Sequence, residues 1–339
     1  MKLLVTGGAG FIGSHYVRSL LTGAYGPQPD LTVTVLDALT YAGNLANLGP
    51  VSGDERLQVV EGDIADAQLV DRLLPGHAVV VNFAAESHVD RSIVGPSAFV
   101  RTNVLGTQVL LEAARANGVR TFLQVSTDEV YGSIEDGCWP EDAPLAPSSP
   151  YSASKAAADL VALAYARTYD LPVVITRGAN TYGPNQYPEK FLPLFVTNAL
   201  DGEPLPVYGD GRQRREWLHV EDHCAAIEHV LRNGESGRVY NVGGQERENL
   251  EVVRRILDLT GTSADLVRMV ADRPGHDRRY SIDSARVADL GWAPRHSFDD
   301  GGLAATVEWY RENHDWWKPI KSGEWEEYYR RQYEARLSS

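Results

Sequence analysis

The sequence is poor in cysteine and in long apolar runs, and both absences narrow what the chain can be. Only 2 cysteines occur among its 339 residues, Cys138 and Cys224, which excludes a disulfide framework and a cysteine-rich zinc site. This usage fits the reducing cytoplasm, where we expect the protein. Because no run of about 18 or more apolar residues occurs, we expect no transmembrane helix. The apolar stretch after Met1 is short and ends at glycines, so we expect no signal peptide.

Positive charge is also scarce. The chain has 32 basic against 46 acidic residues and a formal net charge of −14. Phosphate backbones repel such a chain, so we expect no general nucleic-acid binding, although a local basic pocket for one small anion remains open. With 43% hydrophobic and 23% charged residues, the composition is that of a globular protein and excludes disordered, collagen-like and coiled-coil chains.

Short apolar segments alternate with amphipathic segments through the first half of the chain. Several of the apolar segments lack polar alternation, as strands buried on both faces do. The expected strands are Lys2–Thr6, Thr32–Leu36, Leu57–Val60, Ala78–Phe83, Thr121–Val125 and Val173–Thr176. The expected helices are Gly13–Leu21, Asp66–Leu74, Asn103–Asn117 and Ser152–Tyr169. This repetition predicts an α/β fold with a doubly wound parallel sheet of the Rossmann type.

The pattern changes beyond residue 180, where loops rich in proline and glycine dominate. A further strand signal follows at Arg238–Gly244, then a shorter helix at Leu250–Leu259. We therefore expect a large dinucleotide-binding domain and a smaller, mixed α/β domain for the substrate. The expected ranges are 1–180 with a return segment near 220–245 for the first domain, and 181–219 with 246–339 for the second.

A glycine-rich turn follows the first strand, with glycines at positions 7, 10 and 13. A phosphate bridge at a helix amino terminus needs exposed backbone N–H groups and no Cβ in the way, which glycine provides. Gly13 also allows the helix to pack close to the strand. The pattern lies between an apolar strand and a helix, which is the context that a dinucleotide site requires.

Two carboxylates follow the next strands of this half. Asp37 ends the second strand, where a carboxylate accepts hydrogen bonds from both hydroxyls of the adenosine ribose. It would also repel a 2′-phosphate, so the sequence favours NAD over NADP. Asp63 follows the third strand, where it either meets the adenine amino group or caps a helix.

A Tyr-x-x-x-Lys pair, Tyr151 and Lys155, follows two prolines. Helical spacing puts both side chains on one face. A free tyrosine has a pKa of about 10 and is a poor base at neutral pH, so we expect the Lys155 ammonium to lower the pKa of Tyr151. Lys155 is also placed to bind the nicotinamide ribose.

The glycine pattern and the Tyr-x-x-x-Lys pair together resemble the extended short-chain dehydrogenase/reductase family over nearly the whole chain. In that family a Ser or Thr after the strand before the tyrosine is the third catalytic element, and Thr127 is the positional match. Asp128 and Glu129 follow it directly. A simple oxidoreductase or epimerase needs no such pair. One carboxyl that protonates a leaving hydroxyl and one that removes a carbon-bound proton serve the elimination of water.

Five longer segments resemble the dTDP-glucose 4,6-dehydratase family, in the same order along the chain. They are Asp37–Asn44, Ala84–Ser92, Thr127–Gly132, Tyr182–Lys190 and Arg273–Tyr280. Two departures occur: Thr181 stands where that family commonly has a second Asn, and Phe191 replaces a more usual Leu. The first weakens one expected contact near the nicotinamide, and neither touches the acid–base pair.

The resemblance implies a reaction and its catalytic residues. Tyr151 takes the C4 hydroxyl proton of dTDP-glucose while hydride passes to NAD, which is held tightly and regenerated in each turnover. The 4-ketone acidifies the C5 hydrogen, Glu129 removes it, and Asp128 protonates the departing C6 hydroxyl. The product is a 4-keto-6-deoxy sugar nucleotide. Members of the family pair as homodimers through helices that correspond to 103–117 and 152–169.

The resemblance also implies the binding residues. The cofactor set is Gly7, Gly10, Phe11, Ile12, Gly13, Asp37, Ala38, Leu39, Thr40, Asp63, Ile64, Phe83, Ala84, Ala85, Ser87, Thr102, Tyr151, Lys155 and Thr181. The substrate set is Ser87, Glu129, Asn180, Lys190, Phe191, Pro206, Val207, Tyr208, Arg215, Asn249, Arg273, His276 and Tyr280. Arg215 is expected to clamp the diphosphate, and the segment 206–208 to pack on thymine.

Other interpretations remain open at this point. A nucleotide-sugar 4-epimerase lacks the Asp-Glu pair, and a UDP-glucuronate decarboxylase needs an arginine-rich carboxylate site. A GDP-mannose dehydratase shares the pair but prefers NADP, which Asp37 disfavours. A non-catalytic NAD-binding protein commonly loses the tyrosine or the lysine. We expect no metal site, because His219, His223 and His229 lack acidic partners in a convincing pattern, and structural roles for these histidines are favoured.

Overall fold

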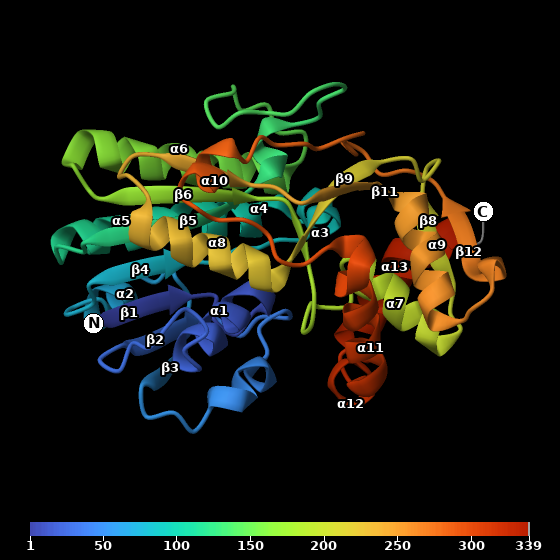
Figure 1. Cartoon of the computed structure of the whole chain (residues 1–339), viewed down its shortest axis with the longest axis horizontal. Helices are drawn as coiled ribbons and strands as arrows, with labels where there is room; N and C mark the ends of the chain where they lie inside the picture. The colour runs from blue at the N-terminus through green and yellow to red at the C-terminus, as the bar shows by residue number, and fades with distance from the viewer. Residues whose placement is uncertain (338–339) are drawn as a thin grey trace.

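The structure is a computed structural model and describes residues 1–337. A seven-stranded parallel sheet forms the larger part of the molecule, with strand order β10-β6-β5-β4-β1-β2-β3 (Figure 1). Its strands are β1 (Lys2–Thr6), β2 (Thr32–Asp37), β3 (Leu57–Glu61), β4 (Val79–Asn82), β5 (Thr121–Thr127), β6 (Val173–Gly178) and β10 (Val239–Val242). The order reverses between β1 and β4, as it does in a Rossmann fold, which confirms the predicted fold class.

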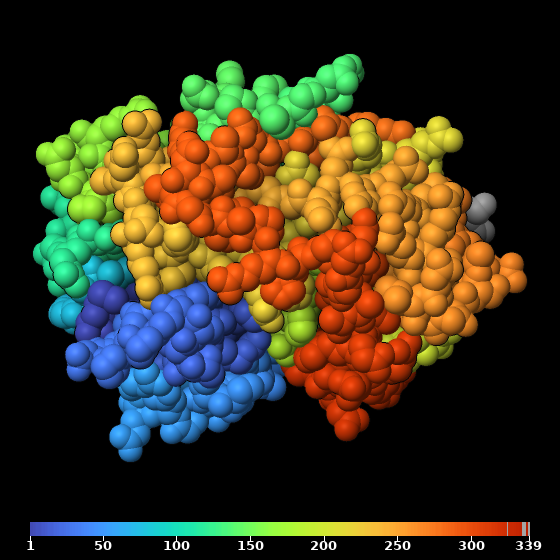
Figure 2. All heavy atoms as spheres, viewed as in Figure 1, coloured from blue at the N-terminus to red at the C-terminus, as the bar shows by residue number. Residues whose placement is uncertain are grey.

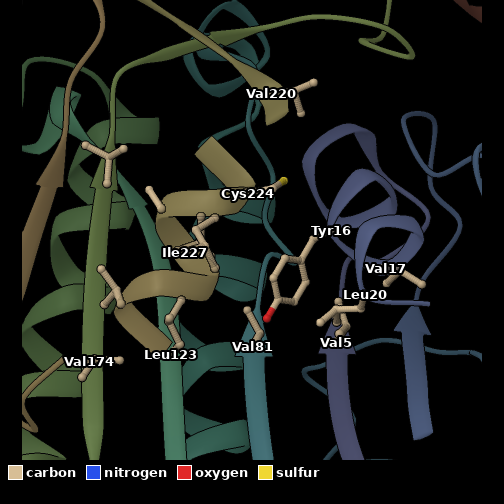
Figure 3. Packing of buried hydrophobic residues seen from close by; sticks show 14 of the residues in the cluster. Val5, Tyr16, Val17, Leu20, Val81, Leu123, Val174, Val220, Cys224 and Ile227 are labelled. Carbon is tan, nitrogen blue, oxygen red and sulfur yellow. The ribbon is translucent and has the colours of Figure 1, made fainter. Parts of the chain in front are cut away.

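Side chains on each strand alternate between two cores. On β1, Leu3 and Val5 face one core, whereas Leu4 faces the other. Figure 3 shows the first core, where Tyr16 and Leu20 of α1 pack beside the sheet. The Tyr16 hydroxyl donates to Glu228 of α8 at 2.6 Å, which ties the two helices of this face together.

Helices cover both faces of this sheet. Helices α1 and α8 supply the first core, and α2, α5 and α6 supply the second. Their bounds are α1 (Phe11–Leu21), α2 (Ala67–Leu73), α3 (Val89–Val94), α4 (Pro96–Phe99), α5 (Thr107–Ala116), α6 (Pro150–Tyr169) and α8 (Val220–Asn233). The short helices are η1 (Leu45–Val51), the π-helix η2 (Val100–Gly106) and η3 (Asp128–Tyr131).

Two details differ from the sequence-based expectation. Strand β3 is the sheet edge, and Gln58 and Val59 on it are exposed, because an edge strand has a neighbour on one side only. The helix expected from Asn103 starts as the π-helix η2 and becomes α-helical only at Thr107. Hydrophobic periodicity does not distinguish these two helix types over so few residues.

A smaller α/β region holds two further sheets and a separate core. Its strands are β7 (Asn180–Tyr182), β8 (Leu205–Tyr208), β9 (Arg214–His219), β11 (Gln245–Glu248) and β12 (Val267–Val270). Its helices are α7 (Phe191–Asp201), α9 (Asn249–Thr260), η4 (Ala264–Leu266), η5 (Phe298–Gly302), α11 (Leu303–Glu312), α12 (His314–Trp317) and α13 (Glu324–Leu337). Trp317 is fully buried in this second core.

The chain passes between the two regions more than once. Segment 220–242 returns to the large sheet as α8 and β10, and β10 pairs with β6. A later segment also packs in the first core through Ile282, Val287 and Trp292, with the short helix α10 (Ala285–Asp289) against β10. Figure 2 shows the amino-terminal and carboxy-terminal segments meeting across a notch in the surface.

Among residues 1–337, no helix combines the length and the apolar character needed to cross a membrane.

Candidate active site

A cavity of about 350 Å³ opens where β1, β4, β5 and β6 end. Its wall continues into the segment 178–190, which connects the two regions, and reaches His223 on α8. Ligands of open α/β sheets bind at this edge, beside the point where the strand order reverses. The fold therefore places this cavity where a dinucleotide is expected.

The glycine turn after β1 has no room for side chains. Gly7 has a φ of 67°, and a Cβ there would lie 2.6 Å from the backbone nitrogen of Ala84. A Cβ on Gly13 would lie 2.3 Å from the carbonyl oxygen of Gly7, so α1 approaches β1 only without one. Helix α1 begins at Phe11 and has no acidic residue in its first turn, which leaves its amino terminus open to an anion.

Backbone N–H groups hold the carboxylate of Asp37 in place. Its Oδ2 accepts from the backbone nitrogen of Ala9 at 2.9 Å, and its Oδ1 accepts from that of Leu39 at 2.9 Å. Asp63 accepts from the backbone nitrogen of Ala65 and pairs with Arg101 at 2.9 Å. Asp66, not Asp63, caps α2, so the capping alternative for Asp63 is wrong.

Most residues predicted from the sequence line this cavity. From the predicted cofactor set, every residue except Leu39 does so: Gly7, Gly10, Phe11, Ile12, Gly13, Asp37, Ala38, Thr40, Asp63, Ile64, Phe83, Ala84, Ala85, Ser87, Thr102, Tyr151, Lys155 and Thr181. Leu39 instead turns the chain with a φ of 48°. Thr127, Asp128, Glu129, Asn180 and Lys190 line the same cavity.

Helix α6 presents Tyr151 and Lys155 one turn apart. Ser149 caps the helix, and its hydroxyl and that of Ser152 form a reciprocal capping box. Lys155 Nζ donates to the carbonyl oxygen of Val125 on β5 at 2.7 Å. Burial lowers the pKa of Lys155 to about 8, and Asp159 opposes that fall.

The predicted effect of Lys155 on Tyr151 is wrong for the chain alone. Burial raises the pKa of Tyr151, and the carboxylates of Glu129 and Asp128 raise it further. A hydrogen bond with Thr127 opposes this rise. The Lys155 ammonium instead donates to the carbonyl oxygen of Val125.

Asp128 and Glu129 form the first turn of η3, directly after β5. The Thr127 hydroxyl donates to Asp128 Oδ1 at 3.1 Å, whereas the buried Asp128 Oδ2 has no partner. The backbone nitrogen of Glu129 donates to the Thr127 hydroxyl at 3.3 Å. Thr127 thus holds the Asp128 carboxyl and the backbone of Glu129 at the cavity wall.

The two carboxyls have different electrostatic surroundings. Burial raises the pKa of Asp128 well above its usual range, and the charges of Glu129 and Glu216 add to the rise. Burial also raises the pKa of Glu129, but three cations oppose it: Arg273, Lys190 and Arg215. Asp128 therefore keeps its proton more readily than Glu129 does. Neighbouring carboxyls with separated pKa values are typical of an acid and a base that act as a pair.

Each of the three cations has a specific support. Arg215 NH2 donates to the carbonyl oxygen of Asp277 at 2.8 Å, and its guanidinium lies 4.2 Å from the centre of the Tyr280 ring. Arg273 pairs with Asp90 at 2.8 Å, and its buried Nε has no partner. Lys190 Nζ donates to the carbonyl oxygen of Ser87.

Several residues of the predicted substrate set do not line the cavity. Pro206 and Val207 are buried on β8, Val207 within the second core, whereas Tyr208 of the same segment is half-buried. The expected packing of this segment on thymine stays a prediction. Phe191 packs on Phe195 and Trp217. The others outside the wall are Tyr208, Arg215, Asn249, Arg273, His276 and Tyr280.

Several residues of the cavity wall were not among the predicted site residues. Those with polar side chains are Glu86, Ser126, Gln186, Tyr187, Glu189 and His223. We favoured a structural role for His223, but the structure places its ring against Gly178 in the wall, with Nδ1 2.8 Å from the Thr181 hydroxyl. Burial lowers its pKa to about 4. No sequence signal indicates this placement, because it depends on how α8 returns to the sheet.

Buried polar atoms without a partner gather around the cavity. They are Ser126 Oγ, Asp128 Oδ2, Asn180 Oδ1, Gln186 Oε1 and His223 Nε2. Buried polar groups are normally hydrogen-bonded, so this set fits a polar ligand that supplies the missing partners. Together with the glycine turn and Asp37, these residues fit a dinucleotide such as NAD in the cavity.

The Rossmann sheet, the glycine turn and the Thr-Tyr-Lys set define the class: an enzyme of the extended short-chain dehydrogenase/reductase type. A family model described as GDP-mannose 4,6 dehydratase matches residues 4–303. A dTDP-glucose 4,6-dehydratase from Streptomyces antibioticus is 57% identical over 324 residues, which cover 95% of this chain and 96% of the relative.

Solved structures agree with this match. The crystal structure of DesIV, a dTDP-glucose 4,6-dehydratase from Streptomyces venezuelae with NAD and TYD bound, is 59% identical with a TM-score of 0.93, covering 95% of this chain and 100% of that one. A dTDP-glucose 4,6-dehydratase from Bacillus anthracis, in complex with NAD, is 47% identical with a TM-score of 0.87 and the same coverage. The chain belongs to the dTDP-glucose 4,6-dehydratase family.

Proposed function

We propose that this chain is a hydro-lyase that converts dTDP-glucose into dTDP-4-keto-6-deoxyglucose with NAD as its cofactor. Relatives above 50% identity that cover nearly the whole chain carry this activity in their names. The glycine turn and Asp37 would hold the adenosine and diphosphate of NAD, and Tyr151 and Lys155 its nicotinamide ribose. When bound, NAD accepts a hydride from C4 of the sugar and later returns it to C6.

The chain's own residues supply the proton steps. Tyr151 removes the C4 hydroxyl proton, and Thr127 holds the C4 oxygen by a hydrogen bond. Once C4 is a ketone, the C5 hydrogen is acidic enough for a carboxylate. Glu129 removes it, while Asp128 protonates the leaving C6 hydroxyl. These roles rest on side chains that share one cavity wall.

One observation carries the proposal: two adjacent carboxyls at the cavity have surroundings that separate their pKa values. Asp128 is buried beside acidic groups, and Glu129 faces Arg273, Lys190 and Arg215. An epimerase needs no acid to protonate a leaving hydroxyl, so this arrangement favours elimination. Arg215 and Lys190 would also attract the diphosphate of the substrate.

Two variants test these roles. Asp128→Asn should oxidise C4 of dTDP-glucose but lose water at least 100-fold more slowly, since no proton reaches the C6 oxygen. Glu129→Gln should lose exchange of the C5 hydrogen with deuterated solvent. Rapid quenching and mass spectrometry measure both steps. Glu135→Gln is a control on a nearby carboxyl outside the cavity wall. Turnover of both variants at the parental rate would contradict the assignment.

We also propose that the protein is a homodimer. Apolar side chains are exposed on α3, η2 and α6, namely Val94, Val100, Leu105 and Leu160. Because α3 and η2 both pack against α6, these side chains suit one face that a second copy would cover. Light scattering after gel filtration measures the mass, and Leu160→Glu should lower it to that of one chain.

We further propose a cytoplasmic location. Both cysteines are unpaired, as is usual in a reducing compartment. Fractionation of cells with an antibody against the chain tests this location.

We propose that residues 1–180, with the return segment near 220–245, form the NAD-binding unit. Segments 181–219 and 246–339 would then bind the sugar nucleotide, with Ser338 and Ser339 outside the described residues. Ile282 and Trp292 pack in the first core, so the boundary between the units is interleaved. Limited proteolysis tests the division, which predicts no stable fragment from a single cut near residue 180.

A further inference from the structure

Two histidines and two acidic residues meet at the start of α8, away from the cavity wall. His219 caps this helix, and its ring stacks on that of His296 with centroids 4.2 Å apart. Glu221 is exposed in the first turn. One ligand atom from each of these three residues lies within 4.8 Å of the others. The sequence did not reveal this group, because His296 comes from a loop 74 positions after Asp222.

Asp222 fixes the orientation of the His296 ring. Its two carboxylate oxygens accept from the backbone nitrogens of Arg295 at 3.0 Å and His296 at 2.8 Å. Oδ1 also lies 3.1 Å from His296 Nδ1. A carboxylate only accepts hydrogen bonds, so Nδ1 carries the ring proton. A carboxylate that fixes the tautomer of a histidine in this way is a usual support for a metal ligand.

The other ring nitrogen of His296 then faces an acceptor. Its Nε2 lies 3.2 Å from Glu221 Oε2. Nε2 and Oε2 can both offer a lone pair to a cation placed between them. Two ligands of a tetrahedral zinc ion lie about 3.3 Å apart, because zinc bonds to nitrogen and oxygen are about 2.0–2.1 Å long.

We propose that His219, Glu221 and His296 form a divalent-metal site that takes Zn²⁺, with Asp222 as the support of His296. Two imidazoles and one carboxylate suit zinc better than magnesium or calcium, which prefer oxygen ligands. Water completes the tetrahedron on the exposed side of Glu221.

Zinc binding requires a small change at His219. Its Nδ1 now accepts from the backbone nitrogen of Glu221 at the long distance of 3.4 Å. A zinc ion on Nε2 displaces the proton from that nitrogen, and Nδ1 takes up a proton. Nδ1 then no longer accepts from the backbone of Glu221, so this weak hydrogen bond is lost. The ion would join the loop 292–298 to the first turn of α8, so it should stabilise the fold.

The test uses the full chain without an affinity tag, stripped with EDTA and titrated with zinc chloride in a calorimeter. We expect one zinc per chain and a rise in Tm of roughly 3 °C. His296→Ala and Glu221→Gln should each lower the affinity at least 10-fold. Glu221 is exposed, so the second variant tests the site even where the first fails to fold. His314→Ala removes an exposed histidine elsewhere and should bind zinc as the parent does.

X-ray absorption at the zinc edge identifies the ligands. The proposal predicts nitrogen and oxygen neighbours at about 2.0–2.1 Å and no sulfur. A sulfur neighbour would assign the zinc to the exposed Cys138 and overturn the proposal. It is also overturned if the parent binds no zinc, which would leave a proton between His296 and Glu221, or if His296→Ala and Glu221→Gln bind zinc like the parent.

Discussion

The large sheet and the smaller region contribute to the cavity in different ways. The sheet presents strand ends, backbone N–H groups and short side chains, with Asp37 held by two backbone nitrogens. The smaller region instead presents long cations to Glu129 from outside the cavity wall. They are Arg215 on β9 and Arg273 in the loop after β12, each held by a distant partner. Backbone placement suits a cofactor that stays bound, whereas charged side chains suit a substrate that must enter and leave. The predictions below test this difference.

The largest expected effect comes from filling the glycine turn. In Gly13→Ala the new Cβ would lie 2.3 Å from the Gly7 carbonyl oxygen, and only the backbone can move away. We expect the purified variant to retain less than about a hundredth of the parental NAD, because the turn that holds the diphosphate is displaced. Absorbance and chromatography of the released nucleotide measure this content. Gly49→Ala is the control, since a Cβ there meets nothing within 4 Å.

The next effect concerns a buried ion pair behind the active site. Asp159 and Arg177 lie 2.9 Å apart, with their side chains 0% and 2% exposed. Asp159→Asn leaves a buried guanidinium without its counter-charge and should cost about 3–5 kcal/mol in the free energy of unfolding. Chemical denaturation measures the loss. Asp210→Asn breaks an exposed pair with Arg278 and should leave the free energy of unfolding nearly unchanged. An equal loss of this free energy in both variants would contradict the account.

A smaller effect should separate substrate from cofactor. Arg215→Lys removes the planar group that stacks on Tyr280 and reaches the Asp277 carbonyl. We expect KM for dTDP-glucose to rise about 10-fold or more while bound NAD stays at the parental level. Steady-state kinetics and the nucleotide content measure the two quantities. Loss of NAD in this variant would show that the two regions do not divide their ligands as proposed.

The smallest effect is a change in stability with pH. The pKa of Asp128 is raised in the folded state, so the folded chain holds this proton more tightly than the unfolded chain. The protonated Asp128 carboxyl contributes fully to stability below the pKa that it has in the unfolded chain. This contribution is lost as the pH rises through the pKa that it has in the folded chain. Asp128→Asn lacks this loss, so its Tm should exceed the parental Tm by a few degrees at pH 7 and match it at pH 4. A lower Tm at pH 7 would contradict the buried environment of Asp128.

Much of the first region follows from the sequence. Strands in a parallel sheet end at one edge, and the residues just after the predicted strand ends Thr6, Leu36 and Val125 line one cavity. Helical spacing likewise placed Tyr151 and Lys155 together. These arguments use only local pattern and the direction of the strands, which the chain determines over short distances.

The smaller region, and the segments that return from it to the large sheet, were harder to predict, because their contacts join residues far apart along the chain. Arg273 meets Asp90 across 183 positions, and Trp292 donates to the carbonyl oxygen of Asp222 in the first core. The role of His223 in the cavity wall depends on the same long-range packing. No local periodicity carries this information.

One measurement tests the central claim most directly. The protein, purified without added nucleotide, is incubated with dTDP-glucose in deuterated water, and the product is weighed by mass spectrometry. If Asp128 and Glu129 remove water while bound NAD is regenerated, the product lacks one water molecule, carries a deuterium at C5 and forms without added cofactor. A product with the mass of the substrate, as an epimer would have, would contradict the account.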